Sequence, residues 1–250
     1  YCGWEQSLLA IVRDAATSPE VRQKAEFATQ LMIDALAATN FVLGNPAVIK
    51  KAVETGGLSL AKGARTFVHD LLTNQGAPQQ VAPGVHAVGK DMAVTPGKVV
   101  FRNELMELIQ YAPSTAEVHE IPLLFSPPWI NKYYVMDLAP GRSLVQWAVD
   151  HGHTVFMISY RNPDQQMRHV KMDDYLISGP VAALEVVGNI TGAEKINLLG
   201  LCLGGTLTMA TLAYLDAVGL ELINSATFLN TLIDFSEPGL LGVFTDEATI

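Results

Sequence analysis

The chain has 250 residues and a net charge of −9, and 49% of its residues are hydrophobic while only 16% are charged. An acidic chain with few cations is poorly suited to a phosphate backbone, which argues against nucleic acid as a partner. Its two cysteines, Cys2 and Cys202, stand far apart and outside any metal-ligand spacing, which argues against a disulfide framework and a zinc site.

The first part of the chain, residues 1–75, is predicted to form a helical domain. Apolar residues recur at helical spacing over residues 4–16 and 21–38, and Ser18-Pro19 supplies a capping residue and a first-turn proline. Asn45-Pro46 begins a third predicted helix, and residues 58–72 form a fourth. We expect an accessory domain packed on a catalytic one, and a partner-binding module is the alternative.

A linker is predicted over residues 76–84 and a catalytic domain over residues 85–250. The domain opens with a predicted hairpin of residues 85–94 and 98–102, then strands over 106–111 and 119–126. Helices then alternate with strands: helices over 138–151, 172–189 and 206–215, and strands over 154–160, 195–199 and 224–233. Such alternation predicts a mostly parallel sheet with helices on both faces and functional residues at the carboxyl ends of its strands.

The segment 200–206, Gly-Leu-Cys-Leu-Gly-Gly-Thr, lies between a predicted buried strand and a predicted apolar helix. Strand, glycine-flanked nucleophile and helix make up the nucleophile elbow of an α/β-hydrolase, here with Cys202 in place of serine. Gly200 and Gly204 stand two residues on either side, where small residues avoid collisions in a strained turn, and Gly205 follows. We therefore predict an α/β-hydrolase fold with Cys202 as the nucleophile; an inert buried thiol is the alternative.

An oxyanion hole in this fold takes one backbone N–H from the residue after the nucleophile and one from the loop after the third strand. Leu203 is the first donor. In the loop, Pro127 and Pro128 have no N–H, so Trp129 and Ile130 are the candidates for the second. A rigid surface turn is the alternative for this loop.

The other members of a triad follow the nucleophile in this fold, yet all six histidines precede Cys202. His151 and His153 flank a glycine at the other edge of the sheet and are interpreted as structural or solvated. The aspartates after the nucleophile are Asp216, Asp234 and Asp246. We therefore expect a fragment, incomplete at its C-terminus, whose missing part carries the triad Asp and His. We also expect a lid to begin near residue 237.

An uncharged run over residues 196–215 has the length of a transmembrane segment and contains a G-x-x-x-G pattern. Glycines and threonines dilute it, and the elbow already requires the glycine spacing. We interpret the run as a buried strand followed by a buried helix.

A cysteine nucleophile favours acyl transfer over hydrolysis. An acyl group that moves from a coenzyme A thioester to a thiol remains a thioester and stays activated for attack by a hydroxyl group. Thiol hydrolases use the same nucleophile, so hydrolysis remains open.

The chain resembles the polyhydroxyalkanoate synthases, and among them the single-subunit, class I-like enzymes that take short-chain substrates. The matching segments are residues 41–46, 102–113, 126–134, 159–164 and 200–206. The resemblance implies an acyltransferase that polymerises (R)-3-hydroxyacyl-CoA, 3-hydroxybutyryl-CoA in particular, and releases coenzyme A. It also implies that Cys202 carries the acyl group, that a downstream His and Asp assist, and that coenzyme A enters only as part of the substrate, with no cofactor.

As partners the resemblance implies a second copy of the complete chain and the surface of a cytoplasmic polyester granule. The 250 residues alone are expected to be inactive. Two alternatives stay open: a cysteine hydrolase of the same fold, such as a polyester depolymerase or thioesterase, and a non-catalytic granule-binding protein with a degenerate core.

Overall fold

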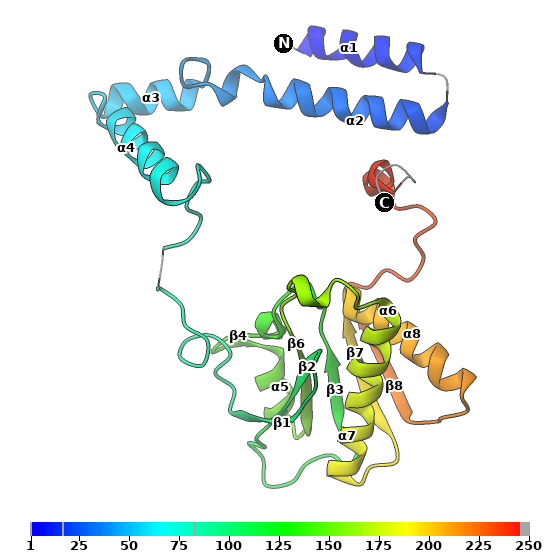
Figure 1. Cartoon of the computed structure of the whole chain (residues 1–250). Coiled ribbons are helices and arrows are strands. Elements are labelled where there is room, and N and C mark those ends of the chain that lie inside the picture. The colour runs from blue at the N-terminus through cyan, green and yellow to red at the C-terminus, as the bar shows by residue number, and fades with distance from the viewer. Residues whose placement is uncertain (1, 17, 83, 246–250) are drawn as a thin grey trace. The chain divides into compact units, whose positions relative to one another are not determined.

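The computed structural model describes residues 2–16, 18–82 and 84–245, which form two compact units (Figure 1). Unit 1 comprises Tyr1–Ala82 together with Ser236–Ile250, and unit 2 comprises Pro83–Phe235. The division after Ala82 falls inside the predicted linker. The boundary after Phe235 differs from the prediction, which assigns all of residues 85–250 to the catalytic domain.

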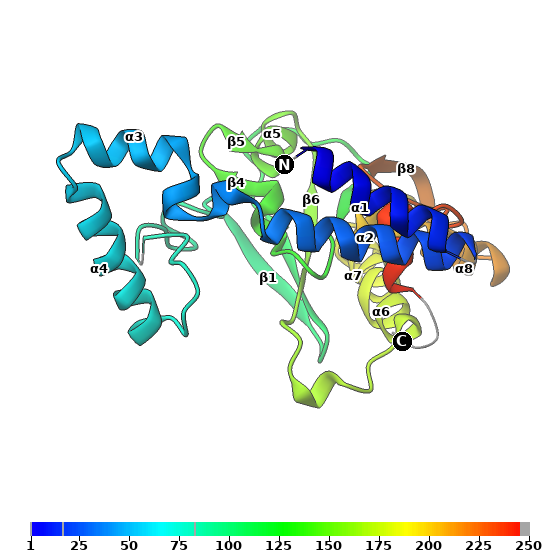
Figure 2. The same cartoon turned by 90° about the horizontal axis from the view of Figure 1, so that it is seen from above.

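Unit 1 contains four α-helices, at the positions expected from the apolar spacing. They are α1 (Cys2–Ala15), α2 (Pro19–Ala35), α3 (Pro46–Glu54) and α4 (Leu58–Thr73), with 3-10 turns η1 (Ala38–Asn40) and η2 (Val42–Gly44) before α3. The predicted caps form: the Ser18 hydroxyl accepts from the Val21 N–H at 3.2 Å, and Asn45 Oδ1 accepts from the Ala47 N–H at 3.0 Å. Helices α1 and α2 lie side by side (Figure 2) and are joined by an Arg13–Glu26 ion pair.

A 3-10 turn from the end of the chain, η6 (Gly239–Phe244), packs on α2 within unit 1. The rings of Phe27 and Phe244 meet edge to face with centroids 5.3 Å apart, and Gln23 Nε2 donates to the Gly239 carbonyl at 3.2 Å. An apolar turn gains by covering the apolar side of a helix. This contact corrects the assignment of residues 239–244 to the catalytic domain; residues 246–250 of the predicted lid lie outside the described residues.

Unit 2 is built on a six-stranded sheet in the order β1-β2-β6-β3-β7-β8. Its strands are β1 (Gly97–Arg102), β2 (Met106–Tyr111), β3 (Leu123–Ser126), β6 (Val155–Tyr160), β7 (Ile196–Leu201) and β8 (Ile223–Leu229). Strand β2 runs antiparallel to both neighbours, and all other pairs are parallel. The strand predicted over residues 119–126 begins only at Leu123, because His119 and Glu120 are polar and belong to the loop before it.

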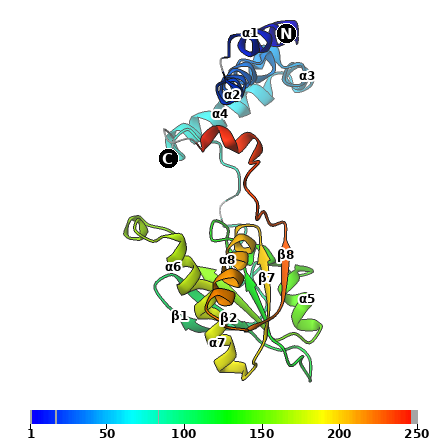
Figure 3. The same cartoon turned by 90° about the vertical axis from the view of Figure 1, so that its right-hand side faces the viewer.

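Helices cover both faces of this sheet: α5 (Leu144–Asp150) on one, and α7 (Ala182–Thr191) and α8 (Leu203–Ala217) on the other (Figure 3). Successive strand residues alternate between the faces. Leu124 and Leu198 join the core cluster under α7 and α8, whereas Phe125 and Leu199 join the cluster under α5. This alternation explains why the central strands are apolar throughout.

The predicted hairpin of residues 85–94 and 98–102 is wrong. Residues 85–94 form a loop with a single bridge between Val88 and Met92, and β1 pairs with β2 instead. The Asp91 side chain accepts a hydrogen bond from the Ala87 N–H at 2.6 Å, which closes this segment into a turn. An Asp side chain that binds nearby backbone competes with strand pairing.

The helix predicted over residues 138–151 begins only at Leu144. Ser143 caps it by accepting from the Gln146 N–H at 2.8 Å. The preceding residues form a 3-10 turn, η3 (Tyr133–Met136), and two short paired strands, β4 (Asp137–Ala139) and β5 (Arg142–Ser143). Gly141 makes the turn between these strands with φ of 73°.

The helix predicted over residues 172–189 is interrupted. It consists of α6 (Met172–Leu176), a π-helical turn η5 (Ile177–Val181) and α7. Pro180 has no N–H and crowds the carbonyl group one turn before it, and Gly179 adopts a non-helical ψ of −107°. The wider π turn accommodates both residues.

Together, the mostly parallel sheet, the single antiparallel β2, the helices on both faces and the sharp turn between β7 and α8 make unit 2 an α/β-hydrolase fold. The predicted fold class is confirmed. Of the helices in the described part of the chain, none combines the length and the apolar character needed to cross a membrane.

Candidate active site

Cys202 occupies the one-residue turn between β7 and α8. Its backbone angles, φ 54° and ψ −123°, are ones that residues other than glycine rarely adopt. The Cys202 N–H donates to the Leu229 carbonyl at 2.9 Å, which ties the turn to β8. Its carbonyl accepts from the Gly205 N–H at 2.9 Å, so the helix starts at once. These bonds hold a partly exposed thiol at the carboxyl end of β7.

Each predicted glycine marks a place where a side chain has no room. A Cβ on Gly200 would lie 2.5 Å from the Gly205 Cα, and one on Gly204 would lie 2.6 Å from the Pro127 carbonyl carbon. A Cβ on Gly205 would lie 2.6 Å from the Thr231 side chain. The glycines therefore allow α8 to approach its own strand, the loop after β3 and the segment after β8.

Strands β3 and β7 are neighbours, and Ser126 at the end of β3 pairs with Gly200. The Ser126 hydroxyl, which is fully buried, donates to the Gly204 carbonyl at 3.3 Å. The elbow and the loop after β3 thus leave the sheet at the same edge. Leu203 opens α8 from the elbow, and the first N–H groups of a helix have no acceptor within the helix.

Trp129 and Ile130, the two candidates for the second backbone donor, differ in their surroundings. Trp129 is partly buried, and its ring lies 5.2 Å from that of Tyr175 in α6. The Ile130 side chain is 69% exposed. The loop turns here, because the Asn131 N–H donates to the Pro128 carbonyl at 3.3 Å.

Polar contacts tie the loop after β3 to the loop after β6. The Lys132 ammonium donates to Asn162 Oδ1. Next to it, Arg161 Nη2 donates to Asp164 Oδ2 at 2.6 Å, and this guanidinium is the main cause that lowers the pKa of the Asp164 carboxyl. Asp164 also caps the 3-10 turn η4 (Gln165–Met167). These contacts organise two of the segments recognised in the sequence, 126–134 and 159–164.

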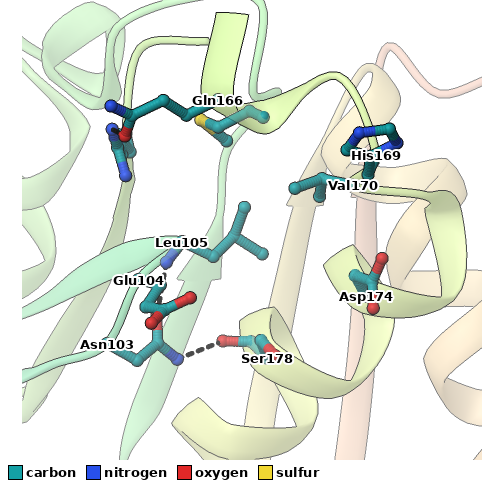
Figure 4. Close-up of a pocket in the computed structure, with 10 residues that line it drawn as sticks. Asn103, Glu104, Leu105, Gln166, His169, Val170, Asp174 and Ser178 are labelled. Carbon is teal, nitrogen blue, oxygen red and sulfur yellow. Dashed lines mark hydrogen bonds between the residues drawn. The ribbon is translucent and has the colours of Figure 1, made fainter. Parts of the chain in front are cut away.

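A cavity of about 620 Å³ opens beside the end of β6, between η4 and α6 (Figure 4). Its lining includes the carboxyl groups of Glu104 and Asp174, the Arg161 guanidinium and the His169 ring. Asn103 Nδ2 donates to the Ser178 carbonyl at 2.8 Å across its wall. The elbow residues do not line this cavity.

The histidines interpreted as structural lie at the opposite edge of the sheet. His151 ends α5 and His153 precedes β6, and the His153 ring lies 4.7 Å from that of His119. His119 Nε2 hydrogen-bonds the His151 carbonyl at 3.1 Å. Burial is the largest cause that lowers the pKa of His153, followed by the charges of the other two histidines.

Among the aspartates that follow Cys202, Asp216 lies near the end of α8 and Asp234 follows β8, whereas Asp246 lies outside the described residues. Among the residues that the structure describes, no group of three or more His, Cys, Asp or Glu side chains could hold a metal ion.

Residue identity alone did not single out three residues of this region. Ser126 contacts the elbow from the end of β3 and Thr231 from the segment after β8, and such contacts appear only once the sheet is assembled. Tyr175 lies on a helix whose interruption had a local signal, the Gly179-Pro180 pair.

We compared the sequence with known protein families and curated proteins. A family described as the N-terminus of poly-beta-hydroxybutyrate polymerase (PhaC) matches residues 1–148. The poly(3-hydroxyalkanoate) polymerase of Methylorubrum extorquens is 45% identical over 231 residues, covering 92% of this chain and 38% of that protein. The PhaC polymerase subunit of Cupriavidus necator is 44% identical over 241 residues, covering 96% of this chain and 40% of that protein. The chain thus spans about two fifths of the length of these relatives.

Solved structures with a similar backbone include a fungal esterase from Rhizomucor miehei. It is 18% identical, with a TM-score of 0.42, over 61% of this chain and 46% of the esterase. The fold assignment rests on the strand order and the turn at Cys202, and not on this likeness.

Proposed function

The chain belongs to the poly-beta-hydroxybutyrate polymerase (PhaC) family, and from this premise we propose that it supplies the nucleophile of a polyester-forming acyltransferase. The substrate is an (R)-3-hydroxyacyl-CoA, with 3-hydroxybutyryl-CoA as the main candidate, and the product is polyhydroxyalkanoate. The names of the relatives support the polymerase reaction, and the cysteine at the elbow supports a thioester intermediate.

One observation carries the proposal: Cys202 is held at φ 54° in a turn that is backed by three glycines without room for a Cβ. A residue is kept in such a strained conformation only where surrounding structure enforces it, and such sites are concentrated where function requires them. An inert core cysteine has no need of this arrangement.

The reaction would proceed in two transfers. The Cys202 sulfur attacks the thioester carbonyl carbon while the thiol proton passes to a base, the bond from that carbon to the coenzyme A sulfur breaks, and coenzyme A leaves and takes up that proton. The 3-hydroxyl oxygen of a second acyl group then attacks the Cys202 thioester and gives its proton to the base. An ester bond forms, the bond from the acyl carbon to the cysteine sulfur breaks, and the sulfur is released and takes up the proton. Because the first transfer exchanges one thioester for another, the acyl group remains activated for the second.

Each transfer places negative charge on the former carbonyl oxygen. We propose the Leu203 N–H as one donor to that oxygen and the Trp129 N–H as the other, with Ile130 as the alternative second donor. The adjacency of β3 and β7 supports this assignment, because it brings the two segments to one edge of the sheet.

We propose that the base and its aspartate belong to a longer polymerase and follow residue 250 in its sequence. Such a polymerase would need no cofactor, would act as a homodimer, and would work at the surface of polyester granules in the cytoplasm. The helical unit 1 is a candidate for contact with the partner or the granule. The 250 residues alone would therefore show no Cys202-dependent turnover.

The test uses 3-hydroxybutyryl-CoA with a full-length polymerase that carries these residues, its Cys202→Ala variant and the 250-residue chain. We expect release of coenzyme A, growth of polymer and an acyl adduct on Cys202 by intact-protein mass spectrometry from the first protein only. Shrinkage of added polyester would instead support a depolymerase, and free 3-hydroxybutyrate without polymer a thioesterase. Granule association without any adduct would support a non-catalytic binding protein. Cys202-dependent turnover by the 250-residue chain would contradict the assignment of the base to a later segment.

A further inference from the structure

Three aromatic rings form a row of tilted contacts, the aromatic stack, and each ring comes from a different element. Trp129 belongs to the loop after β3, Tyr175 to α6, and Tyr160 to the end of β6. The centroids of Trp129 and Tyr175 are 5.2 Å apart at an interplanar angle of 42°, and those of Tyr175 and Tyr160 are 5.6 Å apart at 47°. Rings at this separation attract one another beyond the area that they bury.

The Tyr160 end of the stack is fixed to the sheet. Tyr160 pairs with Met106 of β2, and its hydroxyl is buried without a well-formed hydrogen bond among the described residues. Burial raises the pKa of this phenol well above its usual range. A Cβ on Gly179 would lie 3.1 Å from the hydroxyl oxygen, so the ring packs closely against the π turn at a glycine.

Helix α6 is fixed from a second side. The Asn103 side chain, between β1 and β2, donates to the Ser178 carbonyl in the π turn at 2.8 Å, while its Oδ1 accepts from the Leu105 and Met106 N–H groups. The π turn is therefore bound to the sheet by a hydrogen bond and by the Tyr160 ring. Tyr175, one turn earlier, is carried on a rigid support.

The loop that holds Trp129 is restrained on both sides of that residue. Two prolines precede it, the Asn131 N–H donates to the Pro128 carbonyl at 3.3 Å, and the Lys132 ammonium donates to Asn162 Oδ1. The next side chain, Ile130, is 69% exposed. The ring contact with Tyr175 ties the Trp129 side chain itself to α6.

We propose that Tyr175 is a positioning residue, which holds Trp129 so that its backbone N–H faces the acyl oxygen on Cys202. The proposal rests on the acyl-transfer function proposed above and adds a residue to it. A donor displaced by a fraction of an ångström loses much of its effect on the transition state while substrate binding is little changed. Tyr175 would act through Trp129 and would not itself touch the substrate.

The kinetic test compares Tyr175→Phe and Tyr175→Leu in a full-length polymerase that carries these residues. Loss of one oxyanion donor lowers kcat by about 100-fold or more, so a displaced donor should lower it on the order of 10-fold in Tyr175→Leu, with KM unchanged. Tyr175→Phe keeps the ring and should retain the original kcat.

A spectroscopic test needs no activity and uses the 250-residue chain. With Trp4 and Trp147 replaced by Phe, Trp129 is the sole tryptophan. Tyr175→Leu should shift its emission to longer wavelength, because the indole gains contact with water, whereas Tyr175→Phe should not. Tyr134→Leu is the matched control: this tyrosine lies in η3, directly after the same loop, but its ring packs on Tyr133, at 5.4 Å.

The outcomes separate this proposal from the one that it rests on. An unchanged Trp129 emission and an unchanged kcat in Tyr175→Leu would overturn the positioning role even if Cys202 is acylated normally. An emission shift with no acyl adduct in the parent polymerase would leave the stack in place and overturn the proposed function instead. A fall in kcat in both Tyr175→Leu and Tyr175→Phe would assign the effect to the hydroxyl and contradict a role of the ring.

Discussion

Gly204 in helix α8 and Ser126 at the end of strand β3 touch backbone to backbone, and a Cβ on Gly204 would overlap the Ser126 carbonyl oxygen. The Ser126 hydroxyl donates to the Gly204 carbonyl across the same contact. The start of the helix can therefore not move away from the sheet without breaking a buried hydrogen bond. This contact fixes the distance between the elbow and the loop that follows β3.

The first prediction concerns this contact. Gly204→Ala should lower the free energy of unfolding of unit 2 by about 2 kcal/mol, since overpacking a backbone contact outweighs the gain in helix propensity. The matched control is Gly188→Ala in α7, where the nearest atom to a new Cβ is 3.6 Å away. There alanine should raise stability by about 0.5–1 kcal/mol. Urea unfolding followed by tryptophan fluorescence measures both, and equal effects of the two substitutions would contradict the contact.

The second prediction concerns strain at the nucleophile. Cys202→Gly should be more stable than Cys202→Ala by about 1 kcal/mol, because glycine adopts φ of 54° without the penalty that any Cβ incurs. Both variants remove the thiol, so the difference reports the backbone alone. If the alanine variant equals or exceeds the glycine variant in urea unfolding, the turn is relaxed and the elbow geometry is not strained.

The third prediction concerns a buried carboxylate. Asp137, 1% exposed, accepts hydrogen bonds from Thr95 Oγ1 at 2.6 Å and from Ser143 Oγ at 2.7 Å. Asp137→Ala should lower the free energy of unfolding by about 3 kcal/mol, because the buried Thr95 hydroxyl loses a charged acceptor. Burial is the largest cause that raises the pKa of Tyr111, and the charge of Asp137 is the second.

Asp150 is the matched control for Asp137. It also accepts two hydrogen bonds on one oxygen, from Ser114 Oγ at 2.7 Å and from Gln146 Nε2 at 2.8 Å, but it is exposed. Asp150→Ala should cost less than about 1 kcal/mol, because water replaces the lost partners. Thermal and urea unfolding of the two variants give the comparison, and similar losses would show that burial of Asp137 adds nothing.

The fourth prediction concerns pH. The pKa of His153 is lowered in the folded state, first by burial and then by His119 and His151, so folding favours its neutral form. The unfolded state binds a proton more readily, and stability should therefore fall as pH drops below about 6.5, then level off below the lowered pKa. Urea midpoints between pH 7.5 and pH 4.5 measure this.

His153→Phe should reduce that loss of stability between neutral and acidic pH, since the variant has no ring nitrogen to protonate at this position. His169→Gln, which removes an exposed ring in the same unit, serves as the control and should keep the pH dependence of the original chain. A pH dependence that is identical in all three proteins would assign the effect to other groups.

Local signals in the sequence predicted much of unit 2 and most of unit 1. Ser18 and Asn45, each before a proline, predicted the starts of α2 and α3. The alternation of apolar strands with helices predicted the parallel sheet. The glycine spacing around Cys202 gave the turn between β7 and α8. These features were predictable because each depends on residues within a few positions of one another.

Two of the errors arose where a local side-chain bond or a long-range partner displaced the expected element. Strand β1 pairs with β2 and not with residues 85–94, because Asp91 closes that segment into a turn. Residues 239–244 pack on α2, a helix more than 200 positions earlier in the chain. Neither contact could be predicted from the periodicity of its own segment.

The sequence by itself determined the candidates for the site: a cysteine between glycines at the end of a buried strand, and a loop in which Trp129 and Ile130 carry the first backbone N–H groups after two prolines. Tertiary structure decided what surrounds them. Only the assembled sheet brings Ser126 against Gly204, Thr231 against Gly205 and Tyr175 against Trp129. The physical reason is that sequence spacing fixes local backbone geometry, whereas contacts between elements depend on strand order and on packing across the finished core.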